Sequence, residues 1–200
     1  MHKVFISYHH ANDQAYKEHL VEVARRHRVF MDKSVDTGDI DDRLSDQQIR
    51  KIIRDDYLRD STVTVVLAGC QTARRKHVDW EIYSSMFDGR INKQSGILAI
   101  CLPGTSDSWH VAHEGERRRI YPGHTRWESV TSRAEYERRY PYMPTRIIDN
   151  LMAPGAKISV VPWDRISDNP GNLLWLVEAA FRDRATCNYD LCAPMRRANS

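Results

Sequence analysis

Short apolar runs alternate with helical patterns along most of the chain. The apolar runs are rich in β-branched residues and predict strands; they cover residues 3–8, 28–31, 61–68, 96–102 and 157–161. Apolar residues that recur every three or four positions predict helices; they occur in residues 13–27, 44–57, 77–88 and 172–184. Strands that are apolar throughout and alternate with helices are typical of a parallel sheet covered on both faces. The pattern therefore predicts an α/β sandwich with five parallel strands.

One segment, residues 103–156, interrupts this alternation between the fourth and fifth strands. It is polar, carries Trp, Tyr, Arg and His, and contains one short predicted helix near residues 145–151. Compact α/β folds use short connections, so this length favours a functional lid or docking surface over a decorative insertion, which stays open as the alternative. The whole chain of 200 residues suits a single domain, residues 1–200. Its tail, residues 193–200, is expected to be extended and loosely held.

The charge of the chain indicates little about its partners. Thirty Lys and Arg residues against 27 Asp and Glu residues leave a surplus of three, which is too small to indicate nucleic-acid binding. The arginine runs at 117–119 and 138–139 fit solvated faces better than a phosphate site. No apolar run approaches the roughly 18 residues of a membrane span, and the N-terminus lacks a signal-peptide pattern. We expect a cytoplasmic protein that binds neither nucleic acid nor membrane.

Five stretches of the sequence, taken in their order, resemble the TIR-like family of prokaryotes. They are VFISYHH at the first strand, FMDKSVDTGDID at the second, DSTVTVVLAG at the third, RKHVDWEIYSS in the next helix and KISVVPWDRI at the fifth strand. The resemblance is weaker in the long middle segment. It implies a flavodoxin-like three-layer sandwich with strand order 2-1-3-4-5, in which ligands bind beyond the carboxyl ends of the strands, where the order reverses.

The resemblance also implies a function. Many TIR domains cleave the nicotinamide–ribose bond of NAD, and similar proteins of Thoeris-type antiphage defence convert NAD into an ADP-ribose-derived messenger. NAD is then the substrate, no cofactor is needed, and a separate effector protein reads the signal. TIR domains also associate, so a homo-oligomer or assembly on activation is expected. The alternative is a TIR module that only assembles and has no turnover.

A third function, that of a flavodoxin-like receiver or nucleotide-binding protein, is less favoured. A phosphoacceptor site needs an acidic cluster after the first strand. That strand ends here in Ser7, Tyr8, His9 and His10.

Glu81 matches the catalytic glutamate of the family, which lies early in the helix after the third strand. In the family a frequent Trp precedes this Glu by four residues, whereas here that position holds His77 and a Trp stands at Trp80. A helical wheel places Glu81 on the polar side and Asp79 inside the apolar arc. Asp79, or neither carboxylate, therefore stays open as an alternative.

Cleavage of this bond requires one carboxylate and no catalytic pair. Nicotinamide already carries positive charge and leaves without protonation, while the ribose becomes oxocarbenium-like. A fixed carboxylate in a dry site stabilises that cation. No metal is needed, and the aspartates between residues 36 and 42 lack the spacing of an EF-hand loop. The resemblance assigns residues 32–42 to assembly and gating.

The residues expected around the substrate follow the first two strands and flank the catalytic position. They are Ser7, Tyr8, His9, Asp32, Ser34, His77 and Trp80. For His9 a plainer interpretation stays open, because polar residues between a strand and a helix often only cap and solvate.

The long middle segment suggests a lid that would exclude water and favour a product other than free ADP-ribose. Its aromatic residues Trp109, Tyr121 and Trp127 are candidates to cover the site. The arginines at 117–119 are candidates to hold the pyrophosphate.

Overall fold

Five parallel strands form one sheet in the order β2-β1-β3-β4-β5. They are β1 (His2–Ser7), β2 (Phe30–Asp32), β3 (Val63–Ala68), β4 (Gly96–Cys101) and β5 (Ile158–Pro162). The computed structural model describes residues 1–34, 45–90 and 92–199, with only the backbone at positions 46, 50 and 54. The strand order reverses between β1 and β3, where Ser7 is paired with Val66. The predicted fold class, a flavodoxin-like α/β sandwich with order 2-1-3-4-5, is confirmed.

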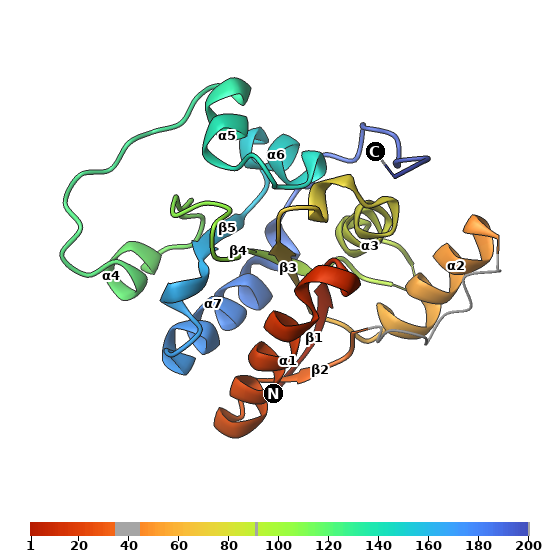
Figure 1. Ribbon diagram of the computed structural model, residues 1–200, viewed down its shortest axis with the longest axis horizontal. Helices are drawn as coiled ribbons and strands as arrows, with labels where there is room; N and C mark the ends of the chain where they lie inside the picture. Colours follow the sequence, from red (N-terminus) through yellow and green to blue (C-terminus); the bar gives the residue numbers. More distant parts are fainter. Residues whose placement is uncertain (35–44, 91, 200) are drawn as a thin grey trace.

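Helices cover both faces of the sheet (Figure 1). One face carries α1 (His10–His27) and α7 (Pro170–Asp183). The other carries α3 (Lys76–Met86) and α6 (Thr145–Met152), with α5 (Arg133–Arg139) packed against α6. Beside α3, α2 (Asp46–Ile52) continues into a short π-helix, Ile53–Tyr57. The remaining elements are α4 (Glu116–Ile120) and three short 3-10 turns, Thr72–Arg74, Trp163–Arg165 and Arg184–Thr186.

The central strands are apolar almost throughout because both of their faces are covered. In β3, Val63, Val65 and Leu67 pack toward α1 and α7, whereas Val66 and Ala68 pack toward α3 and α6. Every residue of β3 and of β4 is buried. Removal of this apolar surface from water is the main stabilising contribution to the sandwich.

Several predicted boundaries are shifted, most clearly at the first helix and the second strand. The first helix begins at His10 and not at residue 13, and β2 begins at Phe30 and not at residue 28. Arg28 has a φ of 54°, in the left-handed region, and this conformation ends α1 and delays the strand. The helix predicted over residues 44–57 is present from Asp46 as α2 and the π-helix, while residue 44 lies outside the described part of the chain.

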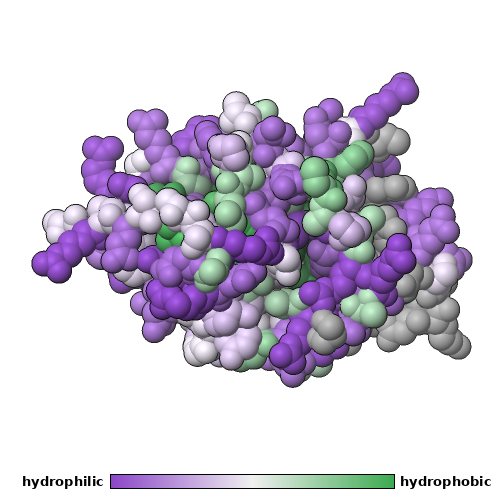
Figure 2. All heavy atoms as spheres, turned by 90° about the horizontal axis from the view of Figure 1, so that it is seen from above, coloured by the Kyte–Doolittle hydropathy of each residue, from purple (hydrophilic) through white to green (hydrophobic). Residues whose placement is uncertain are grey.

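The segment between β4 and β5 contains α4, α5 and α6, of which periodicity predicts only α6. It is fixed to the sheet because His110 and Val160 exchange two backbone hydrogen bonds of 2.9 Å. In Figure 1 the connection from α4 to α5 extends away from the β4–β5 side of the sheet. Seen from above, hydrophobic residues form small separate groups among hydrophilic ones (Figure 2).

The tail is held against α3 and α6, which differs from the expectation of a loose segment. The Arg146 guanidinium donates to the carbonyl oxygens of residues 193 and 194 at 3.1 and 3.3 Å. The Lys76 amide, at the start of α3, donates 2.9 Å to Oδ1 of Asn199. This bond satisfies an amide that no side chain at the preceding residue, Arg75, caps. Each helix in the described ranges is too short or too polar to span a bilayer.

Candidate active site

A serine and a glutamate meet at the edge where the strand order reverses. Ser7 is the last residue of β1, and its hydroxyl donates a 2.5 Å hydrogen bond to Oε2 of Glu81 in the second turn of α3. Both side chains are buried, with exposed fractions of 1% and 6%. Doubly wound sheets bind ligands at this edge. The structure thus brings together two residues that the resemblance to the TIR-like family assigns to the substrate site.

Hydrogen bonds between α3 and β3 position Glu81. The Thr64 hydroxyl of β3 donates 2.8 Å to Oγ of Ser85, and the Ser85 hydroxyl donates 2.8 Å to the carbonyl oxygen of Glu81. The apolar side chains Val78 and Ile82 of the same helix are buried in the cluster that covers this face of the sheet. Packing and hydrogen bonding together direct the Glu81 side chain toward the end of β1.

Burial controls the protonation of Glu81. Removal from water raises its pKa from 4.5 to about 8, and the hydrogen bond from Ser7 offsets only part of that rise. The carboxyl is therefore mainly protonated at neutral pH in this conformation. The helical wheel places Glu81 on the polar side of its helix and so suggests an exposed side chain. That suggestion is wrong, because the end of β1 covers this side of the helix.

Asp32 and Ser34 lie beside the same end of β1. Oγ of Ser34 accepts a 2.9 Å hydrogen bond from the amide of Ile6, the residue before Ser7. The Ser34 amide donates 2.9 Å to Oδ1 of Asp32, and the Ser34 hydroxyl donates to the same oxygen. Oδ2 of Asp32 forms a 3.0 Å ion pair with Lys17 of α1. Ser34 is thus near Ser7, as expected, and Asp32 is held by a cation.

Tyr8 and His9 connect β1 to α1. The Tyr8 hydroxyl donates 2.6 Å to Oε1 of Gln14, and its ring stacks on His10 with centroids 4.4 Å apart. His9 is buried, and its Nδ1 has no hydrogen-bond partner among the described residues. Burial, aided by the charge of Arg75, lowers the pKa of His9. A buried nitrogen without a partner fits a ligand-lining role better than a solvating one.

Asp13 is a buried carboxyl that the sequence analysis does not select. Its Oδ2 accepts a 3.3 Å hydrogen bond from the Thr72 hydroxyl, and burial raises its pKa. The carboxylate lies directly against Gly69, where an added Cβ would be 2.2 Å from Oδ2. The signals that point to it are an aspartate early in the helix after the first strand and a glycine directly after the third.

His77 and Trp80 are grouped with each other and with the tail. Their ring centroids lie 5.1 Å apart. Trp80 is buried beside Phe5 and Ile49, and its indole N–H donates 2.9 Å to the carbonyl oxygen of Arg196. These contacts give Trp80 a structural role in addition to the substrate-lining role expected of it.

Asp79, the alternative carboxylate, joins α3 to α6 and to the tail. Its two oxygens accept hydrogen bonds of 2.9 and 3.1 Å from the buried guanidinium of Arg146. The amide of Arg196 donates a further bond of 2.8 Å to Oδ2. Because both oxygens of Asp79 are occupied by these structural contacts, Glu81 is the stronger candidate for catalysis.

The proposed lid residues occupy a different edge of the sheet in this conformation. Trp109 stacks on Tyr121 with centroids 4.9 Å apart, and Tyr121 meets Trp127 edge to face at 6.0 Å. These rings pack with the α7 side of the core, so closure over Glu81 stays a prediction.

No group of three His, Cys, Asp or Glu side chains is arranged to bind a metal within the described ranges. The aspartates between residues 36 and 42 lie outside the described residues.

Comparison with known families finds a match for the first half of the chain. The family described as Thoeris protein ThsB, TIR-like domain, matches residues 5–107, just over half of the chain. The matched range contains the second half of β1, all of β2 to β4, and both partners of the buried pair, Ser7 and Glu81. No curated protein matches the chain.

Proposed function

Because the chain belongs to the TIR-like domain family of Thoeris protein ThsB, we propose that it cleaves the nicotinamide–ribose bond of NAD and produces an ADP-ribose-derived signal. Membership of this family supports a role in antiphage defence. The observation that carries the proposal is the buried hydrogen bond between Ser7 and Glu81 at the switch point of the sheet. The reaction needs a carboxylate beside the ribose, and a carboxyl held by a serine at the edge where such sheets bind ligands fits that role once it is ionised.

Glu81 is the proposed catalytic residue and Ser7 its positioning residue. As the bond to nicotinamide breaks, the ribose acquires positive charge, which an ionised carboxylate beside it stabilises. The electron pair of the bond leaves with nicotinamide, which departs neutral. The ribose carbon then accepts a nucleophile, whose proton passes to solvent. The Ser7 hydroxyl orients Glu81 and favours its ionised form, because the hydrogen bond lowers the pKa of Glu81.

Assembly would complete the site. The Glu81 carboxyl is buried and mainly protonated at neutral pH in the single chain, whereas catalysis needs it ionised and next to the ribose. We expect a neighbouring TIR domain to open the site and lower this pKa, so a dilute monomer should be nearly silent. A separate effector protein would read the product.

The test compares two Glu→Gln substitutions. Glu81→Gln keeps the shape of the side chain and removes its negative charge, whereas the exposed Glu114→Gln serves as the matched control. Phage-challenged cells that express each full-length variant are assayed for survival, and their lysates for nicotinamide release. We expect Glu81→Gln to lower nicotinamide release at least about a hundredfold and Glu114→Gln to behave as the parent.

Two outcomes contradict the proposal. If Glu81→Gln releases nicotinamide at a rate near that of Glu114→Gln, the catalytic assignment is wrong. Turnover that is first order in protein, from chains shown by light scattering to be monomers, excludes the need for assembly.

A non-catalytic assembly module is the second candidate function. The observation that favours it is the burial and protonation of Glu81, which leave the carboxyl without charge in the isolated chain. This candidate predicts that cells survive phage challenge without any loss of NAD and that Glu81→Gln protects as well as the parent. The same pair of assays therefore distinguishes the two functions.

A further inference from the structure

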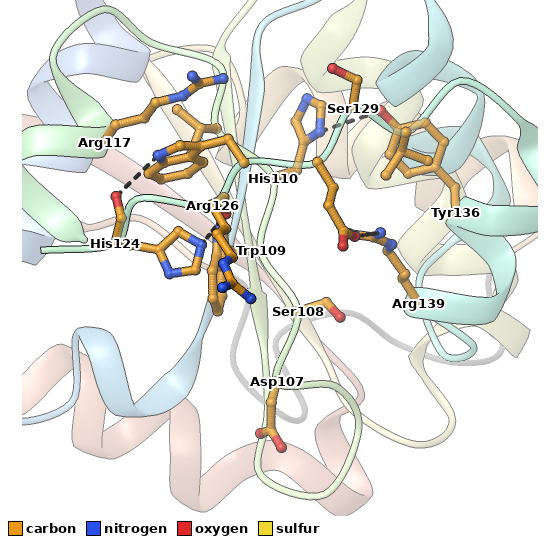
Figure 3. Close-up of a pocket in the computed structure, with 14 residues that line it drawn as sticks. Asp107, Ser108, Trp109, His110, Arg117, His124, Arg126, Ser129, Tyr136 and Arg139 are labelled. Carbon is orange, nitrogen blue, oxygen red and sulfur yellow. Dashed lines mark hydrogen bonds and ion pairs between the residues drawn. The ribbon is translucent and has the colours of Figure 1, made fainter. Parts of the chain in front are cut away.

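A cavity lies within the segment between β4 and β5. It has a volume of about 550 Å³, and all of its lining residues fall between Asp107 and Arg139 (Figure 3). Small-molecule sites commonly have volumes of roughly 300–1,000 Å³. The cavity shares no lining residue with the site of Ser7 and Glu81. It is therefore a separate candidate binding site.

One wall of the cavity is fixed to the sheet. His110, which lines it, is paired through its backbone with Val160 of β5. The Tyr136 hydroxyl and Nδ1 of His110 lie 3.3 Å apart, which ties α5 to the same wall. Burial lowers the pKa of His110 to about 4, so its ring is neutral at physiological pH. This wall offers neutral aromatic surface.

The opposite wall is a group of rings. Trp109 meets His124 edge to face with centroids 5.0 Å apart, and His124 meets Trp127 in the same way at 4.9 Å. The Trp127 indole N–H donates 3.1 Å to the carbonyl oxygen of His124, which fixes the ring (Figure 3). Trp109 and Trp127 are only half-buried. Tryptophan faces and edges at a cavity suit a planar aromatic group of a ligand.

The cavity also carries cations that can bind an anion. Arg126 forms no side-chain hydrogen bond or ion pair within the described part of the chain. The Arg117 guanidinium lies over the ring of Trp127 at 4.5 Å, and the described residues give it no carboxylate partner. In contrast, Arg139 is already paired with Glu128 and Glu135. Guanidinium groups without carboxylate partners are well suited to phosphate.

We propose that this cavity binds a free nucleoside phosphate, with the base against Trp109 and Trp127 and the phosphate on Arg126 and Arg117. The combination of half-buried tryptophans and two guanidiniums without carboxylate partners carries the inference. Its volume is that of a small-molecule site, which favours a single nucleotide over a longer strand. This binding does not rest on NAD cleavage, since it uses none of the residues around Glu81.

Calorimetric titration of the full chain tests the proposal, with ADP as the probe and with adenosine and inorganic pyrophosphate as its separate halves. We expect ADP to bind, and each half to bind at least about tenfold more weakly, because base and phosphate contacts act together. Arg126→Ala should weaken ADP binding at least about tenfold. The exposed Arg118→Ala, a neighbouring substitution outside the cavity lining, should leave it unchanged.

Four results overturn the proposal. One is an absence of heat up to about 5 mM ADP, which corresponds to negligible affinity, and another is equal affinity for ADP and pyrophosphate. A third is ADP binding that Arg126→Ala leaves intact. The fourth is binding of an eight-nucleotide RNA at least about tenfold tighter than ADP, which would indicate a nucleic-acid groove. Glu81→Gln separates the two sites, since loss of ADP binding in that variant places ADP at the other site and also overturns the inference. Thermal unfolding of each variant verifies that it is folded.

Discussion

The Ser7 hydroxyl and the Glu81 carboxyl form a 2.5 Å hydrogen bond although 74 positions separate them in the chain. Two effects act on this carboxyl in opposite directions. Burial raises the pKa of Glu81 to about 8, and the bond from Ser7 lowers it by a smaller amount. The charge of Glu81 at neutral pH therefore depends on how completely the surrounding protein excludes water.

The first prediction concerns stability and pH. Because the folded pKa of about 8 exceeds the ordinary value of 4.5, the folded state binds one more proton than the unfolded state between these values. The free energy of unfolding should fall by roughly 1 kcal/mol per pH unit as the pH rises through this window. Glu81→Gln lacks this titration. In urea unfolding at about pH 5.5, 6.5 and 7.5, the free energy of unfolding of the variant should rise relative to that of the parent by this amount per pH unit.

Glu114→Gln is the control for this measurement, since it should keep the pH dependence of the parent. A stability difference between parent and Glu81→Gln that stays constant across the range would mean that Glu81 is not abnormally protonated.

The second prediction concerns the pH dependence of turnover. Ser7→Ala removes the hydrogen bond that lowers the pKa of Glu81, so the carboxyl should ionise at higher pH. Nicotinamide release by assembled protein should rise with pH, and its midpoint should move upward by about 0.5–1 pH unit in Ser7→Ala. Ser84→Ala, in the same helix, should leave the profile in place. A lower rate with an unmoved midpoint would assign Ser7 a purely structural role.

The third prediction concerns the close approach of Asp13 to Gly69. An added methyl group would lie 2.2 Å from Oδ2 of Asp13, so Gly69→Ala should destabilise the protein by about 1–3 kcal/mol. In an Asp13→Ala background the same substitution should cost at least about 1 kcal/mol less. Gly171→Ala meets the movable end of Arg119 and, at ordinary contact distance, Oδ1 of Asn169, and it should destabilise the protein by no more than about 0.5 kcal/mol. Additive losses in the double variant would contradict the contact.

The fourth prediction concerns the ion pair that joins α3 and α6. Asp79→Asn leaves the buried Arg146 guanidinium with an uncharged partner, and we expect a loss of about 3 kcal/mol in chemical denaturation. Asp149→Asn breaks the more exposed pair with Arg133 and should lose less than about 1 kcal/mol. Similar losses for the two variants would show that the Asp79–Arg146 pair contributes no more to stability than the exposed pair does.

Much of the fold follows from local pattern. The apolar run at residues 61–68 predicts β3, because a strand covered on both faces needs no polar positions. The stripe of Leu173, Leu176 and Val177 predicts α7 in the same way. Boundaries are less predictable, since the end of α1 depends on the left-handed conformation of Arg28.

The environment of the candidate site is less accessible to such reasoning. A helical wheel describes one helix alone, and it assigns Glu81 to solvent because it cannot include the end of β1. The burial of Asp13 likewise depends on Thr72 and Gly69, which follow another strand. The pairing of Asp79 with Arg146 joins residues 67 positions apart. Side chains that come together from distant parts of the chain leave no periodic signal in either segment.

The helix that carries Glu81 is completed by a part of the chain that is synthesised much later. The amide of Lys76 forms its hydrogen bond with Asn199, 123 residues further on, and the indole of Trp80 forms its hydrogen bond with the carbonyl oxygen of Arg196. Neither bond can form before these residues are synthesised. At about 5–20 residues per second this interval is on the order of ten seconds. A nascent or prematurely terminated chain therefore holds α3 without its final anchor. Translation order itself therefore delays the last contacts of α3 until residues 196–199 have been made.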